Sequence, residues 1–166
     1  MRSLSTAILL IALGLIVPIS CVVMNIQFNQ NCAGYLKQAA DANTVELAKE
    51  RIDLAVDYIE MNALVYGYTS VLWKTESENV EYWYKNIKAC QRELEQCKNA
   101  SQLEKSNVLL KVRESLTDNG KDGTELILPY GISRYPNNVL LGIMRAFSYI
   151  LILLGCFVFY NWMEEY

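Results

Sequence analysis

The sequence predicts an all-α membrane protein with two transmembrane helices that flank a water-facing helical domain. Two long apolar runs, Leu4–Met24 and Val139–Tyr160, lie on either side of a polar middle region. Each run has about the 20 residues that a helix needs to cross a hydrocarbon core of roughly 30 Å. The middle region repeats its apolar residues at helical spacing, which is typical of helices that pack together in water.

These runs divide the chain into three predicted parts. Residues 1–28 form an N-terminal transmembrane anchor, residues 29–138 a helical domain, and residues 139–166 a C-terminal transmembrane helix with a short tail. Proline removes one helical hydrogen bond, so Pro18 is expected to kink the first helix. Cleavage of the first run as a signal peptide, or lipidation of Cys21, is the alternative to an uncleaved anchor.

The charges near the first run predict an orientation. Arg2 favours an N-terminus in the cytoplasm. Two crossings then return the C-terminus to the cytoplasm, although its tail, Met163–Tyr166, has no lysine or arginine. The domain is therefore expected on the extracytoplasmic side of an integral membrane protein, in a periplasm or a lumen.

Two segments of the domain predict an antiparallel helical hairpin. Thr44–Met61 follows a capping box that starts at Asn43, and Glu78–Cys97 follows one that starts at Thr75. Gly67 marks the turn between the two segments, whose apolar residues recur at steps of three and four. The two predicted buried faces are Val45, Ala48, Ile52, Ala55 and Ile59, and Val80, Trp83, Ile87, Cys90, Leu94 and Cys97.

The rest of the domain predicts one further helix and an extended return. Asn31–Asp41 continues the first helix into water, and Gln102–Leu116 forms a third domain helix, capped by residues 99–101. Glu125–Pro136 contains two prolines and several β-branched residues, so it is expected to be an extended return segment. The apolar residues of the third helix are Leu103, Leu109, Leu110, Val112 and Leu116.

Composition excludes several classes of function. The chain has no histidine, which excludes a Ser-His-Asp hydrolase, a Cys-His protease and a His-ligated haem or zinc site within it. With 15 basic and 18 acidic residues it has no basic excess, so a nucleic-acid partner is not expected. We predict a protein that is not an enzyme and that has no cofactor and no metal ion.

The cysteines leave two alternatives. Cys32 lies just after the first apolar run, and Cys97 lies at the end of the second hairpin helix. If that helix runs back towards the membrane, a Cys32–Cys97 disulfide becomes possible in an oxidising compartment. The alternative is that these thiols and Cys90 are small, unpaired core residues.

An aromatic cluster gives the first candidate contact surface for a partner. Six aromatic residues lie around the predicted hairpin turn: Tyr66, Tyr68, Trp73, Tyr82, Trp83 and Tyr84. Trp83 belongs to the predicted buried face, and Trp73, Tyr82 and Tyr84 are the candidate contacts. Aromatic side chains are common in binding hot spots because they bury much area at a low entropy cost. The alternative is a small core that closes the turn.

The second predicted membrane helix gives another candidate contact. Arg145 lies within its apolar run, where a charge costs several kcal/mol unless it reaches the headgroups or finds a partner. Gly142 and Ala146 beside it form a small-x-x-x-small patch, a pattern that lets helices approach closely in lipid. The partner is expected to be another membrane subunit or a second copy of this chain.

Together these features favour a non-catalytic accessory or assembly subunit of a larger membrane complex. The bilayer and other membrane proteins, or the chain itself, are its expected partners. An extracytoplasmic ligand-binding or sensory module without its own output domain, or an immunity-type inhibitor, is the alternative. The alternative predicts a polar pocket between the helices.

Overall fold

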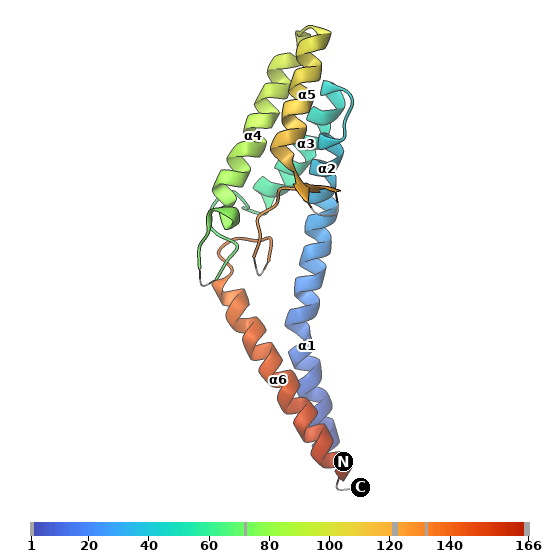
Figure 1. Ribbon diagram of the computed structural model, residues 1–166. Coiled ribbons are helices and arrows are strands. Elements are labelled where there is room, and N and C mark those ends of the chain that lie inside the picture. Colours follow the sequence, from blue (N-terminus) through green and yellow to red (C-terminus); the bar gives the residue numbers. More distant parts are fainter. Residues whose placement is uncertain (1, 72, 121–122, 132, 165–166) are drawn as a thin grey trace. The chain divides into compact units, whose positions relative to one another are not determined.

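The computed structural model describes residues 2–71, 73–120, 123–131 and 133–164. It is mostly helical, with one short β-hairpin that the all-α prediction did not include (Figure 1). The main elements are α1 (Arg2–Phe28), α2 (Gly34–Ala40), α3 (Val45–Met61), α4 (Val80–Gln96), α5 (Gln102–Leu116), β1 (Thr117–Gly120), β2 (Gly123–Leu126) and α6 (Val139–Glu164). The chain divides into two compact units, Met1–Asn25 with Asn138–Tyr166, and Ile26–Asn137.

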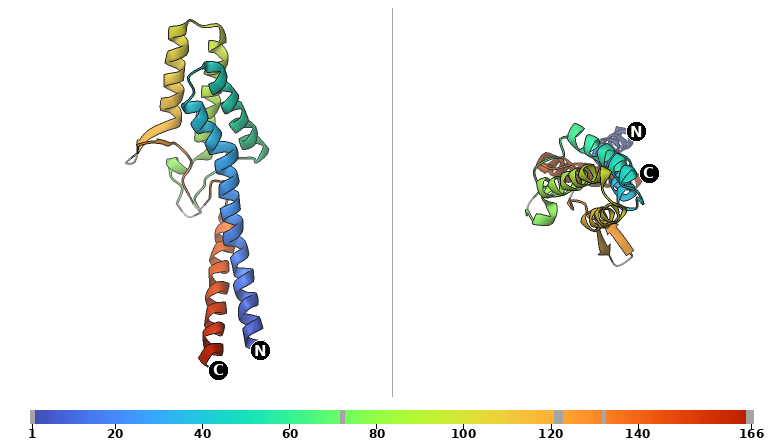
Figure 2. Two further views of the ribbon diagram at one scale, coloured as in Figure 1. Left: turned by 90° about the vertical axis from the view of Figure 1, so that its right-hand side faces the viewer. Right: turned by 90° about the horizontal axis from the view of Figure 1, so that it is seen from above.

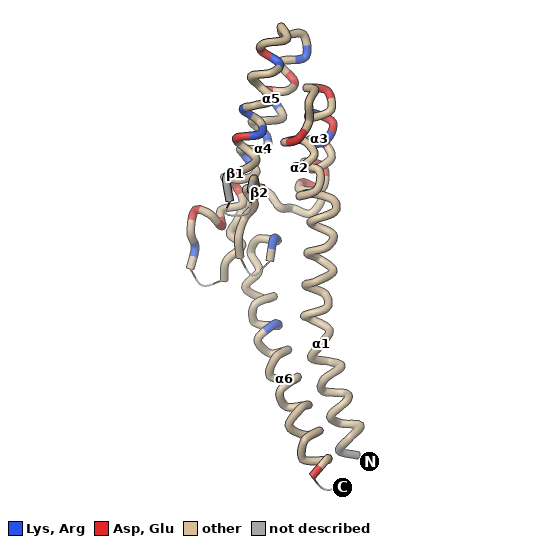
Figure 3. Tube along the Cα trace, turned by 45° about the vertical axis from the view of Figure 1, so that its right-hand side comes forward, with Lys and Arg blue, Asp and Glu red and all other residues tan. Residues whose placement is uncertain are grey.

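The first unit contains two antiparallel helices, most of α1 and all of α6, whose ends N and C lie together (Figure 2). Among the described residues, these are two helices long and apolar enough to cross a membrane, judged by length and composition. Apart from Arg145 and residues at the ends, the tube of this unit carries no charge (Figure 3). Pro18 lies within α1, which continues through it as a helix.

Glycines allow α1 and α6 to approach closely. A Cβ atom at Gly14 would lie 2.6 Å from Ile152 Cγ1 and 3.0 Å from the Ser148 carbonyl oxygen. A Cβ atom at Gly155 would meet Ile11 and the backbone of Ala7 in the same way. Because both sites are too tight for a side chain, only glycine fits at either crossing without a shift of the neighbouring helix.

The second unit is a bundle of α2, α3, α4 and α5. A π-helical turn, Asn29–Ala33, joins the end of α1 to α2 without a break in the helix. Helices α3 and α4 are antiparallel: Lys49 pairs with Glu95 at one end, and Glu60 pairs with Lys88 towards the other. The largest fully buried side chains of the core are Phe28, Leu36, Ile52, Ile59, Leu64, Ile87 and Leu94, with Val80 and Val112.

The capping signals locate the starts of α3, α4 and α5, although the capping residue differs from the predicted one at α3 and α4. Thr44, not Asn43, caps α3, because its hydroxyl accepts the Leu47 amide at 3.2 Å. The capping box at Thr75 is present, but it opens a 3-10 turn, Glu76–Glu78, and Asn79 then caps α4. A further capping box at Ser101 begins α5 where the sequence predicts it.

The leucines of α5 point in two directions. Val112 and Leu116 are buried, and Leu109 packs against them at the edge of the core. Leu103 and Leu110 are 72% and 56% exposed, although the sequence groups them with the other apolar residues of this helix. The reason is their spacing of seven residues, which places both on the face of α5 opposite the bundle.

A β-hairpin and an irregular return segment follow α5. Strands β1 and β2 pair in antiparallel register, with Asp118 opposite Glu125. The return segment beyond β2 is held by backbone groups: the Ile127 amide donates to the Leu116 carbonyl at 2.9 Å. Gly131 lies so close to Thr69 that a Cβ atom there would be 2.2 Å from the Thr69 carbonyl oxygen.

Candidate interaction cleft

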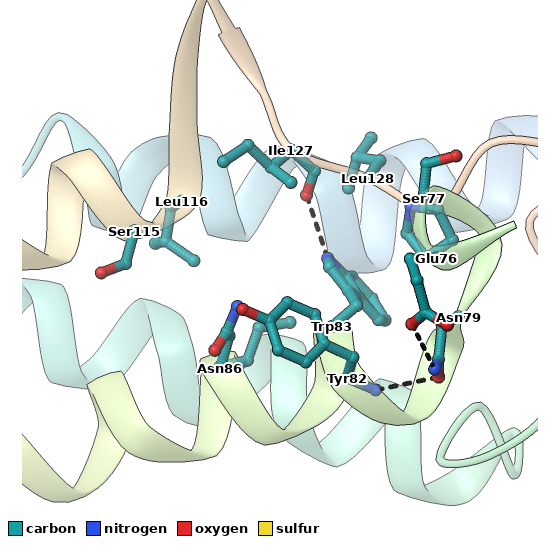
Figure 4. Close-up of a pocket in the computed structure, with 12 residues that line it drawn as sticks. Glu76, Ser77, Asn79, Tyr82, Trp83, Asn86, Ser115, Leu116, Ile127 and Leu128 are labelled. Atoms are coloured by element: carbon teal, nitrogen blue, oxygen red, sulfur yellow. Dashed lines mark hydrogen bonds between the residues drawn. The ribbon is translucent and has the colours of Figure 1, made fainter.

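A cleft in the second unit lies between the start of α4, the end of α5 and the return segment (Figure 4). It has a volume of about 130 Å³. Trp83 and Ile87 belong to its buried wall, and Tyr82 is 61% exposed. The remaining lining residues are Glu76, Ser77, Asn79, Asn86, Ser115, Leu116, Ile127, Leu128 and Pro129.

Several polar groups at the cleft are used to build the domain. The Trp83 indole donates from Nε1 to the Ile127 carbonyl at 3.0 Å, which fixes the return segment over α4. Asn79 Oδ1 accepts the Tyr82 amide at 3.1 Å, and Asn79 Nδ2 donates to Glu76 at 3.2 Å. Most of the surface that the cleft presents to a partner is therefore apolar.

The three aromatic residues predicted as one contact surface lie in different places. Tyr82 faces the cleft, whereas Tyr84 is two residues further on, about 200° around the helix, and contacts α3. Trp73 lies in the connection between α3 and α4 and is 79% exposed. The structure therefore separates Tyr84 from the accessible pair.

Tyr84 has a structural partner. Its hydroxyl donates to Glu60 at 2.6 Å, and this hydrogen bond raises the pKa of Tyr84 to about 12. The same hydrogen bond lowers the pKa of Glu60 from its ordinary value, with help from Lys88. The pair therefore holds α3 to α4 and leaves the Tyr84 hydroxyl engaged.

In the first unit, the residues of α6 that approach α1 closely are Ser148, Ile152 and Gly155. Gly142 is half-buried, Ala146 is exposed, and Arg145 donates from Nε to the Tyr149 hydroxyl at 3.1 Å. The Ser148 hydroxyl instead donates to the Gly14 carbonyl across the two helices. The α1–α6 contact therefore uses residues that the sequence analysis missed.

A sequence signal for that contact does exist. Ala7 and Gly14 are seven residues apart on α1, and Ser148 and Gly155 are seven apart on α6. All four are buried although most of their neighbours are exposed. Small residues at a spacing of seven indicate a seam between helices, whereas Gly142 and Ala146 have a spacing of four.

The structure does not bring Cys32 and Cys97 together, and all five cysteines are free thiols. Cys32 follows Phe28 by one turn, and the Phe28 ring packs 6.4 Å from Tyr58 at the end of α3. Cys97 follows α4 at the level of Val45, the first residue of α3, where Leu94 and Lys98 line a shared hollow.

Val45 and Tyr58 are roughly 20 Å apart along α3, and one helical turn brings Cys32 only about 5 Å closer to Cys97. A disulfide requires Cα atoms within about 7 Å. The disulfide alternative for Cys32 and Cys97 is wrong, and the thiols are unpaired. The reason is that α2 first carries the chain to the far end of the unit. Helix α3 then returns, so α4 runs away from Cys32 instead of towards it.

Two wider hollows are open to solvent. One, of about 720 Å³, lies between α2 and α3 and is lined by Lys37, Asp41 and Arg51 among others. The other, of about 480 Å³, lies over Lys49, which pairs with both Asp53 and Glu95. Within the described residues, no group of three or more Cys, Asp or Glu side chains is placed to hold a metal ion.

Comparison with protein-family models, with curated proteins and with solved structures finds no match for this chain.

Proposed function

We propose that this protein is a non-catalytic accessory or assembly subunit of a larger membrane complex. Helices α1 and α6 anchor it in the bilayer, with both termini in the cytoplasm and the domain on the extracytoplasmic side. The domain docks to another membrane subunit, or to a second copy, through the cleft beside Tyr82. The apolar lining of that cleft is the observation that carries the proposal.

The size of the cleft supports a protein partner over a small ligand. Pockets for small molecules have volumes of roughly 300–1,000 Å³. At about 130 Å³ the cleft holds one inserted side chain. The two larger hollows are open to solvent and lined by charged side chains, so they would bury little of a small molecule.

The chemistry of the cleft supports the same proposal. General acid–base catalysis needs a titratable group aimed at a substrate. Glu76 is the titratable carboxylate among the lining residues, and its side chain accepts from Asn79 at the helix cap. Exposed Tyr82 beside buried Trp83 is instead typical of a binding hot spot, where an aromatic anchor borders an apolar pocket.

Native mass spectrometry tests the proposal, on the full chain extracted in mild detergent from the membranes that produce it. We expect a stoichiometric complex with another membrane protein or with a second copy. Tyr82→Asp should reduce the fraction of complex because it adds a charge at the mouth of an apolar cleft. Leu110→Asp is the matched control, since Leu110 is similarly exposed (56%) on α5 away from the cleft.

Arg145→Leu tests the membrane part of the proposed interface in the same experiment. It should weaken the complex and leave insertion intact, because charged residues in membrane helices usually face protein neighbours. A monodisperse monomer that neither substitution changes contradicts the proposal. That result would favour the sensory or ligand-binding alternative and would indicate that Arg145 only reaches the headgroups.

A further inference from the structure

Both chain connections to the apolar helices enter the second unit at the same end. Phe28, the last residue of α1, packs against Tyr135 with ring centroids 6.4 Å apart. Two residues later, the Asn137 amide donates to the Tyr68 carbonyl at 2.9 Å. This end is therefore formed by the connection between α3 and α4 together with the return segment (Figure 1).

Three aromatic side chains are exposed on these two segments. Tyr66 and Trp73 of the α3–α4 connection are 61% and 79% exposed, and Tyr130 of the return segment is 75% exposed. We call this set the aromatic collar. Exposed apolar side chains that gather at one place on a folded domain are typical of a surface that contacts a membrane or another protein.

The collar rests on a fixed backbone. The Thr69 hydroxyl donates to the Tyr130 carbonyl at 2.8 Å, and the Tyr130 amide donates to the Ser77 carbonyl at 3.4 Å. Val80 donates to the carbonyl of Gly67, whose φ of +102° suits glycine. The two segments thus hold one another, and the aromatic side chains project from an anchored base.

The length of the chain limits how far this end can lie from a membrane. Phe28 lies four positions after the end of the apolar run at Met24, and Asn137 lies two positions before the start of α6 at Val139. At no more than about 3.6 Å per residue, these links span roughly 15 Å and 7 Å. If α1 and α6 cross a bilayer, as the proposed function requires, this end lies at the headgroups.

We infer that the aromatic collar of Tyr66, Trp73 and Tyr130 inserts into the headgroup region of the bilayer and seats the domain there. Tryptophan and tyrosine favour this region because their rings are amphipathic. A lipid surface explains why the collar stays exposed in the folded chain. This inference rests on the proposed function and adds a second membrane contact to the two helices.

The charges around the collar indicate neutral or zwitterionic lipids. Lys74 lies 5.2 Å from the Tyr68 ring centroid, and Arg134 donates to the Pro129 carbonyl. Glu76 and Glu78 in the adjoining turn balance these two cations. Because a preference for anionic lipids needs a basic excess, the surface predicts none.

Tryptophan fluorescence of the full chain in phosphatidylcholine nanodiscs tests the inference. Trp73 emission is isolated as the difference between the native protein and Trp73→Phe. Lipids with a headgroup spin label should quench this difference emission strongly, and the water-soluble quencher acrylamide should quench it weakly. Spin-labelled phosphatidylserine should quench it to the same extent as spin-labelled phosphatidylcholine.

A Leu103→Trp reporter in the Trp73→Phe background is the matched control. Leu103 is 72% exposed at the start of α5, roughly 25 Å away along the length of α4. Acrylamide should quench the emission of this reporter strongly, and the spin-labelled lipids should quench it weakly. Phenylalanine at position 73 leaves the fold intact, because the Trp73 side chain is mostly in solvent.

Trp162 in α6 separates failure of this inference from failure of the proposed function. If lipids quench Trp162 while acrylamide quenches Trp73, the protein is in the membrane and the inference is overturned. If neither lipids nor acrylamide quench Trp73, a protein partner covers the collar and the inference is again overturned. If alkaline washing releases the protein and lipids quench no tryptophan, the proposed membrane function itself fails.

Discussion

The Tyr84 hydroxyl of α4 donates a 2.6 Å hydrogen bond to the Glu60 carboxylate of α3. Lys88, one turn further along α4, lies 3.4 Å from the same oxygen. These contacts join the two helices at the end where their connection begins. They are formed by exposed side chains, so their contribution to stability is modest and depends on pH.

We predict that Tyr84→Phe lowers the free energy of unfolding by about 0.5–1 kcal/mol near neutral pH. The Tyr84 hydrogen bond lowers the pKa of Glu60 below its ordinary value of 4.5. The corresponding stability is therefore present above pH 4.5 and is lost as the pH falls through the lower pKa of the folded state. Unfolding of the full chain in detergent, followed by circular dichroism from neutral pH down to acid, measures this difference.

The same pair predicts a loss of stability in alkali. The pKa of Tyr84 is raised from 10 to about 12, so its contribution is present below pH 10 and is lost as the pH rises towards 12. Tyr82→Phe is the control, since Tyr82 faces the cleft and not α3. Identical pH profiles for native protein and Tyr84→Phe would show that the hydrogen bond has no energetic role.

Ile87→Asp should unfold the domain. Ile87 is 1% exposed within the core, and an unpaired carboxylate there costs more than about 3 kcal/mol. The neighbouring exposed residue supplies the control, because Asn86→Asp adds the same charge in solvent. Thermal melts followed by circular dichroism measure both, and equal melting temperatures would contradict the assigned core.

The thiols should differ in reactivity towards a water-soluble maleimide. Half-buried Cys97 is expected to react in the folded protein, whereas buried Cys32 and Cys90 react only after unfolding. Burial raises the pKa of Cys90, which slows its reaction further because the thiolate is the reactive form. Gel shifts of the native protein and Cys97→Ser, with and without reductant, test this, and a band specific for a Cys32–Cys97 bridge would refute it.

Gly14→Leu should force α1 and α6 apart. The new side chain would occupy the position that Ile152 and the Ser148 carbonyl now fill. Leu13→Ile, at a 47% exposed position on the same helix, is the control. Cross-linking of cysteines introduced in pairs along α1 and α6 reports the contact, and unchanged cross-linking in Gly14→Leu would contradict the close approach.

Local signals in the sequence were sufficient to locate most of the helices. Capping residues, together with apolar residues at steps of three and four, predicted the ends of α3 and α5 to within one residue. The same spacing identified most of the buried residues of α3 and α4, because a helix buries one stripe against its neighbours. It missed buried Val56, and Cys97, which it placed in the buried face, is half-buried. Gly67 was identified as a turn residue, and its positive φ supplies the reason.

Properties that depend on the direction of a helix were not predictable in this way. The hydrophobic pattern of α4 is the same whether the helix runs towards Cys32 or away from it. The pattern therefore could not show that Cys97 lies near the start of α3, at the end of the domain away from Cys32. The pattern of α5 did not show that Leu103 and Leu110 lie outside the bundle. The strands were missed because Thr117–Gly120 is rich in turn residues, and cross-strand pairing is not a local signal.

The β-hairpin has a consequence for the solubility of the domain. A two-stranded sheet has two open edges, each with backbone groups ready to pair with a strand of another molecule. The register places the carboxylates of Asp118 and Glu125 opposite each other, and both side chains are exposed. Charged side chains beside an open edge disfavour pairing with a strand of another molecule. The hairpin is thus protected against aggregation through its edges.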